Sequence, residues 1–276
     1  MRGRLRRVHA PRMRGRITFR WLVILTVFGV SCGDGAAGTQ VRMAFELVGE
    51  DFFAAPLPSE ARDAHSVVGF PTTGAGFMTA LFGLLDAPSG AGTTSSIFFT
   101  TDAPLHADVA QSYDDSTLDA PVLLVRIDAP DPPHPIEVRF REDGGPFGAD
   151  NLLSILPLQG LPLAPNAVYA AVLRTSILDA EGHALAVHPS VRDTRRLPGH
   201  AREMFETALS TLEARGVTDI AGLTVFRTQD PVAPVRALAT AVLAEPRPVV
   251  APFELLETHS NFCVYESAVA MPTYQA

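Results

Sequence analysis

One pentapeptide has the spacing of a nucleophile elbow, the tight turn that presents a catalytic serine. It is Gly29-Val30-Ser31-Cys32-Gly33, and it occurs once in the chain. The elbow requires a strand before the turn and a helix after it, because that geometry exposes the serine. An apolar run does precede Ser31, but residues 34–39 are a Gly/Ala-rich linker that does not favour a helix. The pattern therefore predicts no catalytic serine at this position.

Metal ligation is the second chemistry that the residue types permit. The histidines are His9, His65, His106, His134, His183, His188, His200 and His259. None of them forms His-x-x-x-His or His-Glu-x-x-His, the spacings that place two zinc ligands on one helix face. His183 and His188 lie five residues apart in a predicted turn, where we expect them to be solvated. The acidic loops at Asp114-Asp115 and before Asp150 lack the ligand ladder of a calcium loop. The sequence assigns no metal, cofactor or catalytic residue.

Cys32 stands at the end of a predicted export signal. The first twenty residues hold eight arginines and no acid, and Trp21 to Val30 is an apolar run interrupted only by Thr26 and Gly29. Such a segment is typical of a secretory signal and is too short to span a membrane permanently. Val30-Ser31-Cys32-Gly33 resembles a bacterial lipobox, although Gly29 replaces the usual aliphatic residue. The resemblance implies lipidation of Cys32; the alternative is an ordinary cleaved signal that contains a cysteine.

Removal of the signal would change the charge of the chain. The 276 residues contain 22 arginines, no lysine and 30 acids, for a formal charge of −8. From Cys32 onward, 14 arginines face 30 acids, which gives −16. Such a surface repels nucleic-acid phosphates and anionic lipid headgroups, so we expect no nucleic-acid partner. The length suits one large domain or two small ones.

Short β-rich runs predict five strands between residues 95 and 174. They are 97–99, 122–127, 136–141, 152–156 and 168–174, and their spacing is typical of a β-sandwich. Residues 136–141 alternate apolar and charged side chains, so Val138 and Phe140 should face the core while Arg139 and Arg141 face solvent. A further strand is expected over 41–47, before a proline-rich extended segment that continues to Arg62.

Residues 151–185 form the centre of this pattern, with two strands and two turns. The strand over 168–174 carries Tyr169. We expect its ring to pack in the sandwich and its hydroxyl to bond to the backbone, as in a tyrosine corner.

Helical signals dominate after Arg195. The first helix has Met204, Phe205, Ala208, Leu209 and Leu212 on one face and ends at Gly216. A strand over 223–228 follows. The second helix should start at Asp230-Pro231, with Val232, Val235, Leu238, Ala239 and Val242 on its buried side. A strand over 262–269 and a short helix over 75–86 complete the prediction. The expected fold is mainly β: an Ig-like antiparallel β-sandwich with an appended helix-strand-helix segment, α+β overall.

Several segments, taken in order, resemble the N-terminal region of exported bacterial lipases of the virulence-factor lipase group. Residues 52–62, FFAAPLPSEAR, are similar to the Phe/Pro-rich opening of that region, and 95–105 to its strand and Asp-Pro-Leu turn. Residues 162–185 resemble its Ig-like closing hairpin, and 225–231 its strand-to-helix junction. The likeness extends over roughly residues 45 to 245. In that family an α/β-hydrolase domain with the serine nucleophile follows, and nothing in these 276 residues corresponds to it.

These patterns together suggest a domain organisation and a function. We expect a signal peptide over 1–31, a flexible linker over 32–40, an Ig-like domain over 41–195, and a segment over 196–276 with the helical appendage and the start of a further domain. The resemblance implies a non-catalytic N-terminal domain of an exported, lipid-anchored esterase or lipase-like protein in the outer membrane, in the periplasm or at the cell surface. Its partners would be the downstream hydrolase domain and, through the anchor, the membrane. The alternative is a stand-alone lipoprotein that binds a partner or glycan through its sandwich loops.

Cys263 is the one cysteine besides Cys32, and thiols of exported proteins are usually paired. It lies in the predicted strand over 262–269, which has no obvious neighbour. Such a strand would expose an unpaired edge that is prone to associate with other chains. These features favour the front part of a longer protein, in which Cys263 is separated from its partner. The alternative is a buried, reduced Cys263 in a complete domain.

Overall fold

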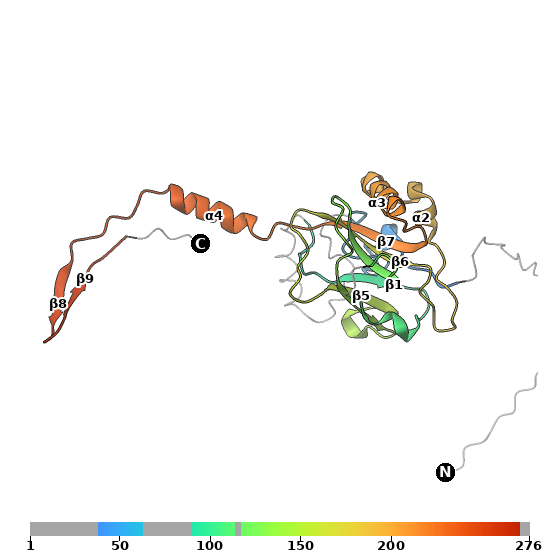
Figure 1. Cartoon of the computed structure of the whole chain (residues 1–276), viewed down its shortest axis with the longest axis horizontal. Helices are drawn as coiled ribbons and strands as arrows, with labels where there is room; N and C mark the ends of the chain where they lie inside the picture. The colour runs from blue at the N-terminus through green and yellow to red at the C-terminus, as the bar shows by residue number, and fades with distance from the viewer. Residues whose placement is uncertain (1–37, 63–89, 114–116, 271–276) are drawn as a thin grey trace, which may run out of the picture. The chain divides into compact units, whose positions relative to one another are not determined.

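The computed structural model describes residues 38–62, 90–113 and 117–270 (Figure 1). The strands are β1 (Ile97–Thr100), β2 (Ser112–Tyr113), β3 (Val122–Arg126), β4 (Ile136–Arg141), β5 (Leu152–Pro157), β6 (Val168–Arg174), β7 (Ile220–Arg227), β8 (Glu254–Thr258) and β9 (Cys263–Glu266). The α-helices are α2 (Pro189–Arg192), α3 (Arg202–Ala214) and α4 (Ala233–Ala244). The short 3-10 turns are η1 (Phe45–Leu47), η2 (Ala107–Val109), η3 (Gly145–Phe147) and η4 (Thr194–Arg196). The helix expected over 75–86 lies outside the described residues.

The strands form antiparallel sheets. One has the order β1-β5-β4-β2, the second the order β3-β6-β7, and the third consists of β8 and β9. The chain is therefore mainly β with few helices, as the alternation of its residues predicts. All five strands expected between residues 95 and 174 are present, and β7 and β9 match the two expected after Arg195. The sequence pattern did not indicate β2 or β8.

The predicted orientation of β4 is confirmed. Ile136 and Val138 are 1% and 2% exposed, whereas Arg139 and Arg141 are exposed to solvent. Phe140 is half-buried and packs against the core. Because successive side chains of a strand alternate between its faces, this burial pattern fixes the register of β4.

One continuous hydrophobic core contains side chains of both larger sheets. Phe99 and Leu153 come from the four-stranded sheet, and Leu124 and Val172 from the three-stranded one. The ring of Tyr169 is buried in this core, as predicted, and stacks on Phe226 with ring centroids 6.2 Å apart.

The core continues beyond residue 195. Phe205, Ala208 and Leu212 of α3 are buried in it, and β7 pairs with β6 along its whole length. The helix ends where predicted, with Gly216 in the left-handed region at φ 84°. The segment from residue 196 that the sequence predicts as an appendage is thus built into the core as far as β7.

The strand expected over 41–47 is not a regular strand. Gln40 and Val41 form only isolated bridges, to Ala186 and Thr101, and η1 begins at Phe45. Val41 is nevertheless 1% exposed, because its side chain packs against Gly222 of β7. Side-chain packing and single backbone hydrogen bonds, such as that from the Arg42 amide to the carbonyl of Thr100, hold this segment in place without a regular ladder.

Candidate functional site

The residues singled out for catalysis or lipidation, Ser31 and Cys32, lie outside the described part of the chain. Within residues 38–62, 90–113 and 117–270, none of the described histidines hydrogen-bonds to a described serine, threonine or cysteine side chain. Two histidine rings cap short turns instead: His106 Nδ1 accepts from the Asp108 amide, and His188 Nδ1 from the Ser190 amide. The described histidines therefore do not form a nucleophile–base pair.

Asp179, Glu181 and His183 place possible metal ligands within 4.8 Å of one another. The Asp179 carboxylate, however, already accepts hydrogen bonds from the amides of His183 and Glu181, at 2.8 and 3.1 Å, and from Thr39 Oγ1 at 2.9 Å. These hydrogen bonds lower the pKa of Asp179, and the bond from the His183 amide has the largest effect. His183 itself is solvated, as expected. His188, which was expected to be solvated as well, is instead half-buried at the start of α2. Because donors occupy the carboxylate, the arrangement fits a turn that ties Thr39 to 179–183 better than it fits a cation site.

A buried cation ends the proline-rich segment. The Arg62 guanidinium stacks 4.6 Å from the centre of the Phe52 ring, and its Nη1 donates to the carbonyls of Phe52 and Ala55. Burial lowers the pKa of Arg62 to about 10, and the charge of Asp51 opposes that shift. These contacts close the loop 52–62 on itself, so we assign Arg62 a structural role.

The most unusual surface in the described residues is residues 230–270, which we call the C-terminal arm. Every residue from Pro231 to Cys263 is exposed. Thirteen of the seventeen large apolar side chains that the described residues leave exposed lie in this arm. Soluble proteins seldom expose so much contiguous apolar surface unless another molecule or domain covers it.

α4 contributes a stripe of apolar side chains to the arm. The sequence predicts that Val232, Val235, Leu238, Ala239 and Val242 are buried, and this prediction is wrong: Val235 is 64% exposed and Leu238 50%. The helix begins at Ala233, after the predicted first-turn Pro231, although Asp230 Oδ1 accepts from the amides of Val232 and Ala233. The helix is amphipathic, but no described residue covers its apolar side.

The β8–β9 hairpin contributes the rest of the apolar surface. Phe253 is 71% exposed, and Leu255 and Tyr265, which pair across the hairpin, are 55% and 58% exposed. Cys263 pairs with Thr258 and is exposed with a free thiol, so the alternative of a buried cysteine is wrong. Like charges meet at the open end, where Glu254 lies opposite Glu266, and this contact destabilises the hairpin.

Elementary stability arguments apply to both parts of the arm. A two-stranded hairpin alone is at best marginally stable in water, and three or more strands with an apolar face are needed for independence. An isolated helix of twelve residues, the length of α4, is also only marginally stable in water, because nucleation of a helix is costly. The arm therefore has the sequence pattern of a helix and a hairpin, but no described residue packs against them to stabilise them.

Among the helices of the described residues, none has both the length and the apolar character that crossing a membrane requires. Comparison with known proteins adds no assignment: no protein-family model matches the chain, and no curated protein matches its sequence.

Proposed function

We propose that this chain is a non-catalytic docking domain of an exported, lipid-anchored protein, and that its C-terminal arm packs against a hydrolase domain of the serine esterase class. The observation that carries the proposal is the exposure of the arm, from Pro231 to Cys263, on segments whose local pattern is that of buried structure. The class of the partner domain rests on the resemblance to the N-terminal region of exported lipases.

In this proposal the body of the protein is an Ig-like β-sandwich. The four-stranded sheet and the three-stranded sheet share one core, and both are antiparallel. A sandwich with a closed core supplies rigidity and needs no chemistry of its own. His106, His188 and Asp179 fit such a scaffold, because their side chains accept hydrogen bonds from backbone amides.

The arm supplies the docking surface. The exposed stripe of Val232, Val235, Leu238 and Val242 is spaced for one face of α4, and each side chain that becomes fully buried stabilises the contact by roughly 1.5–3 kcal/mol. Docking would also place the hairpin strands against a larger structure, which they need for stability. Cys32 and the linker after it would hold the assembly at a membrane.

The experiment compares the chain with the longer protein that its gene would encode if the reading frame continues past codon 276. We expect the chain alone not to hydrolyse p-nitrophenyl butyrate, and the longer protein, which should contain a new Gly-x-Ser-x-Gly, to do so. Amide hydrogen exchange of α4, β8 and β9 should be fast in the chain alone and slower by roughly 100-fold in the longer protein.

A matched pair of variants tests the arm itself. Leu238→Glu with Val242→Glu should restore fast exchange in the arm of the longer protein, because charges replace the apolar contact. Arg236→Gln, on the same helix and 68% exposed, should leave the protection intact. A stop codon at position 277, or arm amides equally protected in the chain alone, would overturn the proposal and favour the stand-alone lipoprotein.

A further inference from the structure

β4 has an edge that its neighbour only partly covers. β2 pairs with the first two residues of β4, Tyr113 with Ile136 and Ser112 with Glu137. The next contact is a hydrogen bond of 2.9 Å from the Val138 amide to the carbonyl of Gln111. No ladder pair joins the two strands beyond this bond: the chain before β2 forms η2, which stays close to β4, and β4 continues for three more residues.

The direction of the backbone groups on this edge follows from the register. The Leu158 amide donates to the carbonyl of Pro135, so the odd-numbered residues of β4 bond to β5. In an antiparallel ladder the N–H and C=O of one residue point to the same side, and the sides alternate. The N–H and C=O of Phe140 therefore point to the open edge, where none of the described residues bonds to them.

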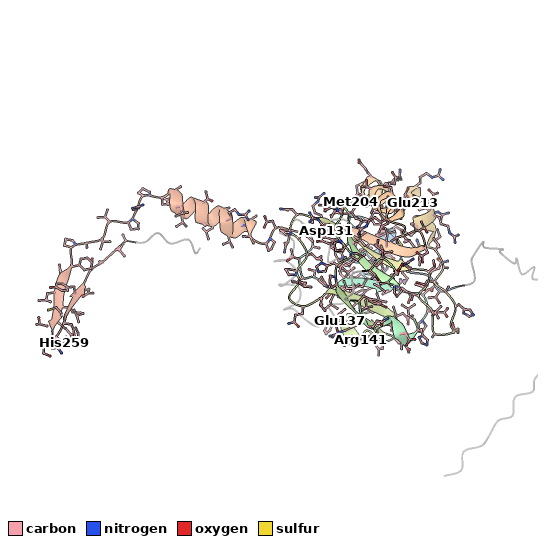
Figure 2. All side chains as sticks on the ribbon, viewed as in Figure 1. Asp131, Glu137, Arg141, Met204, Glu213 and His259 are labelled. Carbon is pink, nitrogen blue, oxygen red and sulfur yellow. The ribbon has the colours of Figure 1, made fainter. Side chains whose placement is uncertain are left out.

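A hollow lies beside these two free groups. It has a volume of about 440 Å³ and is lined by residues 110–112 and 137–141. Figure 2 shows Glu137 and Arg141 at the same margin of the folded body. Unpaired backbone groups next to an open hollow are the requirement for strand addition, in which an extended peptide continues a sheet.

We propose that the open edge of β4 binds an extended acidic peptide segment as an additional antiparallel strand, with Phe140 as the residue that pairs with it. The peptide residue opposite Phe140 lies on the same face as the half-buried ring and should be apolar. Its two neighbours lie opposite Arg139 and Arg141 on the solvent face and should be acidic, because opposite charges across a ladder stabilise it.

The charges argue against a second copy of the chain as the occupant. Two β4 edges can pair antiparallel through Phe140 with Phe140 opposite Phe140 or with Phe140 opposite Val138. The first register places Arg139 opposite Arg141, and the second places Arg139 opposite Arg139. Like charges directly opposite disfavour the first register. The second register also places Glu137 opposite Arg141, but it needs the Val138 amide, which already donates to the carbonyl of Gln111. Arg139 contacts Glu137 at 2.7 Å, whereas Arg141 has no ion pair with any described residue and is free for an acidic partner.

The test uses the full chain and a fluorescein-labelled peptide, acetyl-Glu-Val-Glu-Val-Glu-amide, in a fluorescence anisotropy titration. We expect saturable binding, and at least about tenfold weaker binding of the Lys-Val-Lys-Val-Lys counterpart. N-methylation of both valine amides should weaken binding about tenfold or more, because these N–H groups face β4. N-methylation of the third and fifth residues, whose N–H groups face away, should change it by less than about twofold.

Two protein variants locate the site. Phe140→Pro removes the donor on the open edge, a position where a strand tolerates proline, and should abolish binding. Arg141→Glu should weaken the binding of the acidic peptide and strengthen the binding of the lysine peptide. The proposal fails if the acidic peptide does not bind at millimolar concentration, or if both N-methylated peptides bind equally well. The N-methylation result uses the unmodified protein, so it decides the question even if Phe140→Pro fails to fold. The outcome is independent of the arm, since β4 and residues 230–270 are tested by different variants.

Discussion

The hydroxyl oxygen of Tyr169 accepts a hydrogen bond from the backbone amide of Ala164, five residues earlier and 3.0 Å away. The carbonyl of Ala164 in turn accepts a bond of 2.6 Å from Thr228 Oγ1, at the end of β7. One short turn before β6 is thereby tied both to its own strand and to the neighbouring strand. This is the geometry of a tyrosine corner, and it confirms the role that the sequence predicts for Tyr169.

Tyr169→Phe tests this contact. The change deletes one hydroxyl and leaves the Ala164 amide without its acceptor, so we expect the free energy of unfolding to fall by about 1–2 kcal/mol. Urea denaturation measures the loss. Tyr113→Phe is the matched control, because the Tyr113 hydroxyl donates to Val109 at 3.3 Å in a less buried site. Equal losses in both variants would contradict the role of Tyr169.

Period-two alternation was sufficient to predict β4, because the burial of Ile136 and Val138 depends only on side chains within the strand. The apolar stripe of α4 has the same helical spacing as that of α3, yet Leu212 is fully buried and Leu238 is half exposed. Periodicity shows which face of a helix seeks burial, and it does not show what covers that face. What covers the apolar face of α4 depends on tertiary or intermolecular contacts, which the local sequence does not specify.

The free edge of β4 could not be predicted for a related reason. It depends on where Ser112 and Tyr113 pair, two residues too few to give a strand signal. The regular strand predicted over 41–47 is wrong, because a local apolar run does not distinguish a ladder strand from a segment with isolated bridges and buried side chains. Of the sites considered from the sequence, the turn at His183 was expected to be solvated, and Asp179 was not singled out.

A pair of substitutions tests the contrast between the two helices. Leu212→Asp should unfold the chain, because an unpaired carboxylate in the core costs several kcal/mol, comparable to the whole stability of a domain. Leu238→Asp should change the free energy of unfolding by less than about 0.5 kcal/mol, because its side chain is already exposed. Thermal unfolding followed by circular dichroism distinguishes the two. A large loss from Leu238→Asp would show that α4 is packed within the chain itself.

The cap of α2 should make stability depend on pH. His188 Nδ1 accepts the Ser190 amide, so only the neutral ring can cap the helix. Burial first, and then the charge of Arg196, lower the pKa of His188, while Glu46 opposes the shift. Since the folded pKa lies below the unfolded value near 6.5, the stabilisation is complete above about pH 6.5 and decreases as the pH falls toward the folded pKa.

His188→Asn isolates this effect. Asparagine also caps helices and does not titrate, so the variant should lose less stability than the parent between pH 7.5 and pH 5.5. One proton contributes at most about 1.4 kcal/mol per pH unit, which sets the largest difference in slope to expect in urea titrations. His200→Asn, at an exposed histidine, should retain the slope of the parent. Identical slopes for His188→Asn and the parent would show that His188 does not titrate within this range.

Membrane attachment can be tested at Cys32. Expressed in a Gram-negative host, the full chain should fractionate with membranes, and Cys32→Ser should release it to the periplasm, because the lipid acceptor is removed. Cys263→Ser is the matched control and should leave the distribution unchanged. If the Cys32→Ser variant and the parent distribute identically, lipidation is wrong and the simple cleaved signal is favoured.

Gly222 of β7 has no side chain and so leaves room in the core for Val41. A Cβ at position 222 would lie 2.8 Å from the Cβ of Val41 and 2.9 and 3.0 Å from its two methyl groups, closer than carbon atoms pack. Val41 is stiff at χ1, so the segment around it would have to shift. We expect Gly222→Ala to lower the free energy of unfolding by about 1–3 kcal/mol, in the range of overpacked cores.

A double-mutant cycle shows whether the cost arises from this contact. Val41→Ala alone should destabilise the chain by the loss of two buried methyl groups, about 1–2 kcal/mol. In that background the two methyl groups that would meet the added Cβ are gone, so Gly222→Ala should cost less than it does beside Val41, with a coupling of at least about 0.5 kcal/mol. Gly199→Ala, where a Cβ meets nothing within 4 Å, should be nearly neutral. Simply additive costs would contradict a role of the two methyl groups and would leave the Cβ of residue 41, 2.8 Å from the added Cβ, as the contact that Gly222 relieves.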